Sequence, residues 1–227
     1  MGESSTPAFC LFLRAKGEVR HHVYQASKLW SLPILFNSER QVDTVNFINM
    51  ADGTAEEYAF LGKHEEEYAR GLSVRLVEAL KKLEHSFSGY KVSRLEHSLQ
   101  SATRAYQDGR SIDYVVAALL HDIGDELAPY SHSEMAAAIL RPYVEERLYW
   151  IIKTHGVFQM FYYAHHIGGD QNARDRFKEN QWYNDAVEFC HLYDQNCFDP
   201  DYKSKPLSFF EPMVAEVFSR EPAFGEE

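Results

Sequence analysis

The segment Ala117-Ala-Leu-Leu-His-Asp-Ile-Gly124 constrains the fold most, because an apolar helical stretch ends there in the pair His121-Asp122. Imidazole and carboxylate side by side suit iron, manganese, zinc or nickel, and the segment has none of the thiolates that favour copper or clusters. A carboxylate next to a histidine ligand can also bridge a second ion. The pair therefore predicts a metal centre with one or two ions, provided that further ligands lie at compatible spacings.

Apolar residues recur at helical spacing around this pair, and convincing strand alternation is absent. Capping-box patterns at Thr54-Ala-Glu-Glu57 and Ser131-His-Ser-Glu134 predict two helix starts. Gly156 and Gly168-Gly169 are expected to form turns. The sequence predicts an all-α fold, with helices over residues 72–83, 95–107, 112–122, 135–140, 145–154, 182–196 and 209–219.

Two regions are expected along the chain. Residues 1–40 lack periodicity and contain Pro7 and Pro33, which predicts an irregular arm. We expect this arm to pack on the domain through a cluster of apolar side chains, namely Trp30, Leu32, Ile34, Leu35 and Phe36. Residues 41–227 are expected to form the helical bundle.

Composition excludes several classes of function. The chain has 34 acidic and 23 basic residues and a net charge of −11, which argues against sequence-independent binding to nucleic acid. Its three cysteines lack a CxxC spacing, and no apolar run approaches the length of a membrane span. We expect a cytoplasmic protein without a membrane partner; the oligomeric state is open, with a monomer slightly favoured.

Further potential ligands lie on the helices that flank the pair. They are imidazoles and a carboxylate at helix ends or on apolar faces: His97, His132, His155 and Asp194. Bundle cores are where di-metal sites are built from inward-facing side chains. In a workable geometry, one ion takes His97, His121, Asp122 and Asp194. A second ion then takes Asp122 as a bridge, together with His132 and His155, so Asp122 and His121 are the expected catalytic centre.

With this set in place, the chain resembles the HD-domain superfamily over about residues 85–200, which implies an HD-domain helical bundle with a metal site in its core. Within that superfamily, His97-Ser-Leu-Gln-Ser-Ala resembles the His-x-x-Gln-Thr-Ala segment of the mixed-valent di-iron oxygenases. Those enzymes are typified by myo-inositol oxygenase and the phosphonate-cleaving HD oxygenases. Tyr193-Asp194 and His155, followed by His166-Ile-Gly-Gly-Asp170, are similar to inositol oxygenase.

The resemblance implies an oxygenase that uses two iron ions, Fe(II)/Fe(III), and O2 to cleave a C–C or C–P bond. The substrate would be a small polar, hydroxylated molecule. Manganese or another divalent metal is the alternative cofactor. A metal-dependent phosphohydrolase or phosphodiesterase is the alternative function, and a degenerate HD domain used for binding or regulation is a third.

One position departs from the family. Asp125, followed by Glu126, stands where inositol oxygenase carries a lysine and the phosphonate enzymes tend to carry a histidine. A substrate-binding cation is therefore missing at this position, which leaves the substrate open and weighs against a phosphate ester.

Candidate substrate contacts are polar side chains near the expected ligands. They are Gln159, His166, His191, Lys153 and Arg104, with Arg174 and Arg176 as further cations. Gln100 and Tyr193, which lie beside ligands, are expected to orient them through hydrogen bonds.

Overall fold

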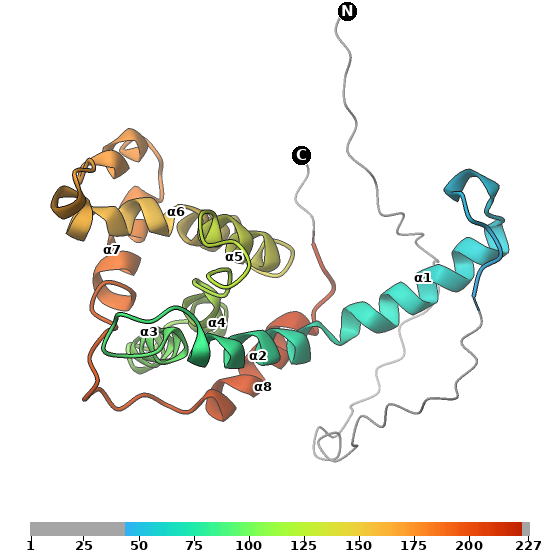
Figure 1. Cartoon of the computed structure of the whole chain (residues 1–227), viewed down its shortest axis with the longest axis horizontal. Helices are drawn as coiled ribbons and strands as arrows, with labels where there is room; N and C mark the ends of the chain where they lie inside the picture. The colour runs from blue at the N-terminus through green and yellow to red at the C-terminus, as the bar shows by residue number, and fades with distance from the viewer. Residues whose placement is uncertain (1–43, 224–227) are drawn as a thin grey trace, which may run out of the picture. The chain divides into compact units, whose positions relative to one another are not determined.

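A computed structural model describes residues 44–223 of the chain (Figure 1). The expected arm over residues 1–40, including its apolar cluster, lies outside the described residues. The chain divides into two units, residues 1–67 and 68–227.

The described part of the first unit contains the short 3-10 helix η1 (Met50–Asp52) and most of helix α1 (Ala55–Arg70). The predicted capping box starts α1. The Thr54 N–H donates to Glu57 Oε2 at 3.0 Å, and the Glu57 N–H donates to Thr54 Oγ1 at 3.3 Å. This reciprocal pair satisfies two amides that a helix start leaves without partners.

Seven α-helices follow in the second unit, and residues 44–223 contain no strand, which confirms the predicted all-α fold. The helices are α2 (Leu72–Lys82), α3 (Arg94–Gln107), α4 (Ile112–Leu120), α5 (His132–Leu140), α6 (Glu146–Tyr163), α7 (Tyr183–Tyr193) and α8 (Leu207–Phe218). Within the described range, no helix has the length and apolar character needed to cross a membrane.

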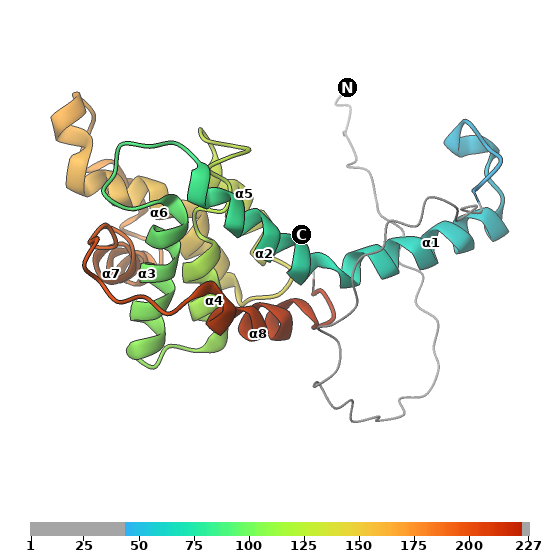
Figure 2. The same cartoon turned by 60° about the horizontal axis from the view of Figure 1, so that its bottom comes forward.

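Helix α4 forms the centre of this bundle because every residue from Tyr114 to Leu120 is buried. It packs on α3, α6 and α8, while α5 lies along α6, and α2 lies along α8 (Figure 2). A helix that is apolar all round is expected at such a buried position. The chain therefore delivers His121, directly after α4, into the middle of the bundle.

Two expectations about local structure were wrong. Gly156 lies inside α6, which continues to Tyr163, instead of forming a turn. A Cβ at Gly156 would meet Ser133 Oγ at 2.8 Å, so the glycine lets the start of α5 approach α6 closely. The Ser131 side chain makes no capping bond at the start of α5, whereas the turn at Gly168 is present, with a φ of 78°.

Candidate metal centre

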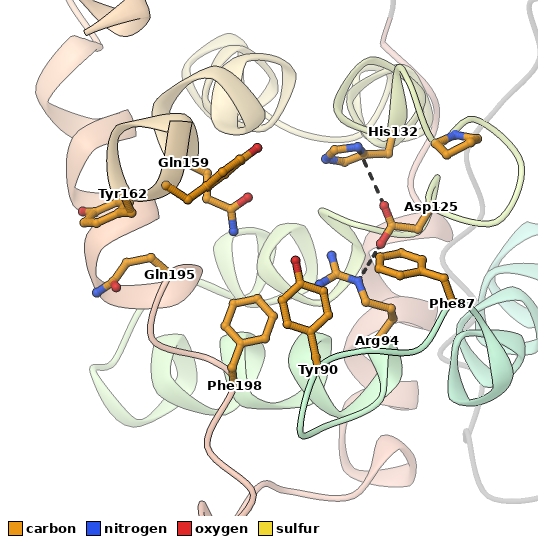
Figure 3. A pocket seen from close by; sticks show the side chains of 11 residues that line it. Phe87, Tyr90, Arg94, Asp125, His132, Gln159, Tyr162, Gln195 and Phe198 are labelled. Carbon is orange, nitrogen blue, oxygen red and sulfur yellow. Dashed lines mark hydrogen bonds and ion pairs between the residues drawn. The ribbon is translucent and has the colours of Figure 1, made fainter. Parts of the chain in front are cut away.

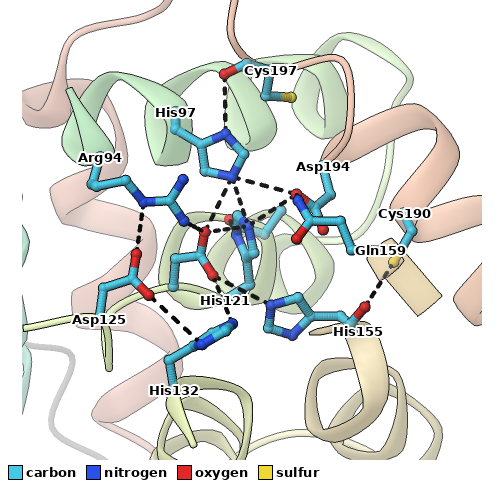
Figure 4. A network of polar contacts seen from close by, with 12 residues as sticks. Arg94, His97, His121, Asp125, His132, His155, Gln159, Cys190, Asp194 and Cys197 are labelled. Atoms are coloured by element: carbon cyan, nitrogen blue, oxygen red, sulfur yellow. Dashed lines mark hydrogen bonds and ion pairs between the residues drawn. The ribbon is translucent and has the colours of Figure 1, made fainter. Parts of the chain in front are cut away.

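The structure brings all six predicted ligands together (Figure 4). His97 comes from α3, His155 from α6, and His132 is the first residue of α5. His121 and Asp122 lie in the turn after α4, and Asp194 follows the last residue of α7. Five segments of the bundle thus contribute to one cluster.

A close approach between the turn after α4 and the start of α5 builds one side of this cluster. A Cβ at Gly124 would lie only 2.8 Å from His132 Cα and from the His132 carbonyl oxygen. Only glycine leaves room for backbone at that distance. Gly124 thereby lets His132 come near Asp122.

One oxygen of Asp122 faces the first pair of histidines. Asp122 Oδ2 lies 3.2 Å from His97 Nε2 and 3.2 Å from His121 Nε2. Asp194 Oδ1 lies 3.5 Å from His97 Nε2 and 3.8 Å from His121 Nε2. These four side chains match the expected ligand set of a first ion.

The other oxygen of Asp122 faces the second pair. Asp122 Oδ1 lies 3.3 Å from His155 Nε2 and 3.4 Å from His132 Nε2. Asp122 therefore stands between two pairs of imidazoles with one oxygen toward each, which is the arrangement expected of a bridging carboxylate.

The outer ring nitrogens of three histidines are held by backbone carbonyls. His121 Nδ1 lies 2.7 Å from the Ala118 oxygen, His155 Nδ1 2.7 Å from the Ile152 oxygen, and His97 Nδ1 3.0 Å from the Cys197 oxygen. A hydrogen on Nδ1 leaves the Nε2 lone pair directed at the centre. This is the tautomer and orientation that protein metal sites use.

Two features of the cluster fit a metal ion in particular. His97 Nε2 and His121 Nε2 lie 3.0 Å apart, and two lone pairs at that distance repel unless a proton or a metal ion lies between them. Asp194 is fully buried, yet its Oδ2 has no hydrogen-bond partner. A buried carboxylate oxygen without a partner is costly, and a cation would satisfy it.

The charged groups of the cluster shift the pKa values of their neighbours. Burial disfavours the charged form of His121, but the attraction and hydrogen bonds of Asp122 and Asp194 outweigh it and raise its pKa to about 10. Burial alone would raise the pKa of Asp122, but the charges of His121 and Arg94 hold it well below its usual range. Burial lowers the pKa of His132. His121 is thus the group whose proton competes with a metal at neutral pH.

A buried arginine, which the sequence analysis missed, borders the cluster. Arg94 Nη2 donates to Asp122 Oδ2, and Arg94 Nε donates to Asp125 Oδ2 at 2.6 Å. Asp125 is itself buried, and its Oδ1 lies 3.7 Å from His132 Nδ1. The signal in the sequence was the spacing Arg94-x-x-His97, which puts both residues on one face of α3. The position after Gly124 carries no cation, as the sequence shows, but the guanidinium of Arg94 lies beside it on Asp125.

A cavity of about 460 Å³ opens beside the cluster (Figure 3). Arg94, Asp125 and His132 form its charged and polar edge, and Gln159 and Gln195 contribute amides. The rest of the wall is mostly aromatic and consists of Phe87, Tyr90, Tyr162, Tyr163 and Phe198, with Pro129. The volume suits a small organic molecule.

Of the five candidate substrate residues, Gln159 lines this cavity, and its amide donates to Asp194 Oδ1. His191 does not line the cavity itself. Its Nδ1 lies 3.3 Å from the hydroxyl of Tyr162, which does. His166 is exposed in η3 (Ala164–Ile167) and packs on His165. The structure therefore places neither histidine among the lining residues.

The candidate cations also lie away from the lining residues. Lys153 is exposed on α6, and its ammonium faces the Tyr149 ring. Arg104 donates to the Asn196 carbonyl and packs on Tyr202. Arg174 packs over the ring of Phe161, and Arg176 over that of Phe177.

The two expected orienting residues make specific contacts. The Gln100 amide donates to the Asp199 carbonyl at 2.7 Å and accepts from the Asp199 N–H at 3.3 Å, which fixes the segment that follows Asp194. The Tyr193 hydroxyl donates to Asp108 at 2.9 Å and accepts from Arg110 at 2.8 Å. Both anchor the chain on either side of Asp194.

All residues of this cluster lie within a segment that is similar to a known protein family. Residues 94–201 match the HD-domain family model. The matched segment begins at Arg94 and contains all six clustered ligands, so the candidate metal centre lies inside the segment that is similar to HD domains. HD domains bind divalent metals, which agrees with the chemistry of the cluster. No curated protein matches the chain.

Proposed function

We propose that this HD domain is a di-iron oxygenase that uses O2 to cleave a C–C or C–P bond of a small substrate. The division of the ligands around Asp122 carries the proposal. His97 and His121 with Asp194 form one group of two histidines and a carboxylate, and His132 and His155 with Asp122 form another. Two histidines and one carboxylate are the ligand set of non-haem iron oxygenases.

The residues of the chain have distinct roles in this reaction. Asp122, with one oxygen toward each pair of histidines, would help to hold both ions, and Gln159 orients Asp194 while it faces the cavity. The aromatic wall excludes water and positions the substrate next to His132, the ligand that borders the cavity. The iron ions, when bound, supply the binding and reduction of O2.

Electron paramagnetic resonance on iron-loaded, partly oxidised protein tests this proposal. We expect a coupled mixed-valent signal, with O2 uptake on hydroxylated carboxylates or hydroxylated phosphonates. Asp122→Asn should abolish both, whereas Asp113→Asn, at a surface ion pair with Arg220, should retain them. Metal-dependent turnover without O2 uptake would overturn the oxygenase proposal.

One observation favours the second candidate, a metal-dependent phosphohydrolase. The guanidinium of Arg94 borders both the cluster and the cavity, and hydrolysis of a phosphate ester needs such a cation near its metal pair. The distinguishing measurement is cleavage of bis(4-nitrophenyl) phosphate by the manganese-loaded protein under anaerobic conditions. Turnover there that is lost in Asp122→Asn would support hydrolysis.

A further inference from the structure

We propose that Asp125 positions His132 as a ligand of the second ion by accepting a hydrogen bond from its outer ring nitrogen, Nδ1. The inference rests on the two-ion centre of the proposed function, and it holds for either of the two reactions considered there. At the position directly after Gly124, the chain thus carries a residue that serves a metal ligand instead of a substrate-binding cation.

His132 differs from the other histidines of the cluster in what its outer nitrogen meets. His121 and His155 each turn Nδ1 to the carbonyl three residues earlier, that of Ala118 or Ile152. His132 is the first residue of α5, so no helical turn precedes it to supply such a carbonyl. Among residues 44–223, no backbone carbonyl accepts a hydrogen bond from His132 Nδ1. Because the partner of the outer nitrogen sets the tautomer and orientation of a histidine ligand, this imidazole needs an acceptor from elsewhere.

Asp125 is the acceptor that faces this nitrogen (Figure 4). Asp125 Oδ1 lies 3.7 Å from His132 Nδ1, and His132 Nε2, on the other side of the ring, lies 3.4 Å from Asp122 Oδ1. The imidazole therefore stands between two carboxylates, with one nitrogen toward each. A direct hydrogen bond to Asp125 requires a further approach of about 0.5 Å. A small rotation of the partly exposed His132 ring provides it when Nε2 binds an ion.

The turn after α4 holds Asp125 in place for this role. Its other oxygen, Oδ2, accepts from Arg94 Nε at 2.6 Å, and its backbone N–H donates to the Asp122 carbonyl at 3.0 Å. Gly124 permits the close approach of this turn to α5, since a Cβ there would lie 2.8 Å from His132 Cα. Asp125 is only 8% exposed. Its carboxylate is therefore directed at His132 before any ion binds.

A carboxylate in this position changes the ligand more than a backbone carbonyl does. It attracts the Nδ1 proton of His132 more strongly than a neutral oxygen, which makes Nε2 a stronger electron donor to the ion. It also adds a negative charge close to the second ion, where exclusion of water strengthens the attraction. Loss of such an outer partner typically costs about 10–100-fold in metal affinity. Asp125 should therefore increase the affinity for the second ion in particular.

Zinc titration of the metal-free, full-length chain tests the inference, because zinc binds imidazoles and carboxylates without redox chemistry. We expect the wild type to bind two zinc ions. Asp125→Asn should weaken the second ion by about 10–100-fold, and the first ion, at His97, His121 and Asp194, should stay bound. The matched control Glu126→Gln removes the neighbouring acid, which is exposed, and should leave both affinities within about twofold.

Nuclear magnetic resonance of the zinc-loaded chain, with isotope-labelled histidine, separates positioning from a general structural role. In the wild type, His132 should bind zinc through Nε2 and carry a strongly deshielded proton on Nδ1. Its signal is assigned by its loss in His132→Gln. Asp125→Asn should shift this proton upfield and leave the Nδ1 protons of the other three histidines in place, whereas a structural loss would move all four.

An unchanged affinity for the second ion in Asp125→Asn would overturn the inference. A wild-type His132 without a proton on Nδ1 would also overturn it, and this measurement needs no variant, so it applies even if Asp125→Asn does not fold. Both results leave the proposed function standing, since two ions remain bound. Absence of O2 uptake by the iron-loaded protein would overturn the oxygenase proposal and leave the role of Asp125 intact. A wild-type chain that binds fewer than two zinc ions would overturn both.

Discussion

At the scale of single residues, Asp122 has the most demanding position in the cluster. Four imidazoles and one guanidinium approach its two oxygens, and its side chain is only 3% exposed. A buried carboxylate is tolerated only where cations or hydrogen bonds compensate its charge. We therefore expect each group around Asp122 to affect how many metal ions the cluster can bind.

His132→Gln is expected to lower the metal content from two ions to one. His132 lies near Asp122 Oδ1 and Asp125, whereas the first ligand group contains His97, His121 and Asp194 and remains intact. Elemental analysis after gel filtration measures the stoichiometry. His166→Gln, which removes an exposed histidine, is the matched control and should keep both ions. Loss of both ions in His132→Gln would contradict two separable positions.

Metal binding at pH 7 is expected to release about one proton per chain. The raised pKa of His121, about 10, means that this imidazole is protonated at pH 7 without metal and must lose its proton to become a ligand. Affinity should therefore rise with pH and level off near pH 10. Calorimetry in buffers of different ionisation enthalpy counts the protons; an affinity independent of pH between 6 and 9 would disprove the assignment.

At the scale of elements, helical periodicity predicted the existence of the helices better than their ends. The start of α3 was predicted at Leu95 and lies at Arg94, whereas α6 was predicted to end at Thr154 and continues to Tyr163. Gly156 misled the prediction because its role depends on Ser133, which packs against it from another helix. Local sequence contains no information on such a contact.

At the site, too, features of the local sequence were predictable, whereas contacts between helices were not. The ligands were predictable because imidazoles and carboxylates at helix ends form a chemical pattern along the chain. Arg94 and Asp125 were not paired in advance because their contact joins α3 to the turn after α4. Lys153 and Arg104 were predicted to contact the substrate because of their charge, but neither lines the cavity. The direction of a side chain depends on packing, which the charge of a residue does not indicate.

Gly124→Ala is expected to destabilise the bundle by about 1–3 kcal/mol, because the added methyl group meets backbone atoms of His132 that cannot move independently. Gly156→Ala is the matched control. Its methyl group meets the movable Ser133 hydroxyl, and a helical alanine offsets the cost, so the change should stay within about 1 kcal/mol. Urea unfolding with metal analysis checks both variants; equal effects would argue against the close approach at Gly124.

At the scale of the whole molecule, the cluster joins segments that are distant in the chain. His97 Nδ1 contacts the carbonyl of Cys197, which lies 100 positions further along. The other predicted ligands lie between them and come from the turn after α4, from α5, from α6 and from the end of α7. The ligand cluster is therefore complete only when nearly all of the bundle has assembled.

This dependence on distant segments has a kinetic consequence. Contacts of high contact order require the closure of long loops, and they form late when a chain folds. A ligand that binds only the completed centre stabilises the native state more than the folding transition state, and it should slow unfolding without speeding refolding. Stopped-flow chevron plots of metal-loaded and chelated protein will show whether the refolding arm stays in place. A metal ion that accelerated refolding would mean that the cluster begins to form before the helices have docked.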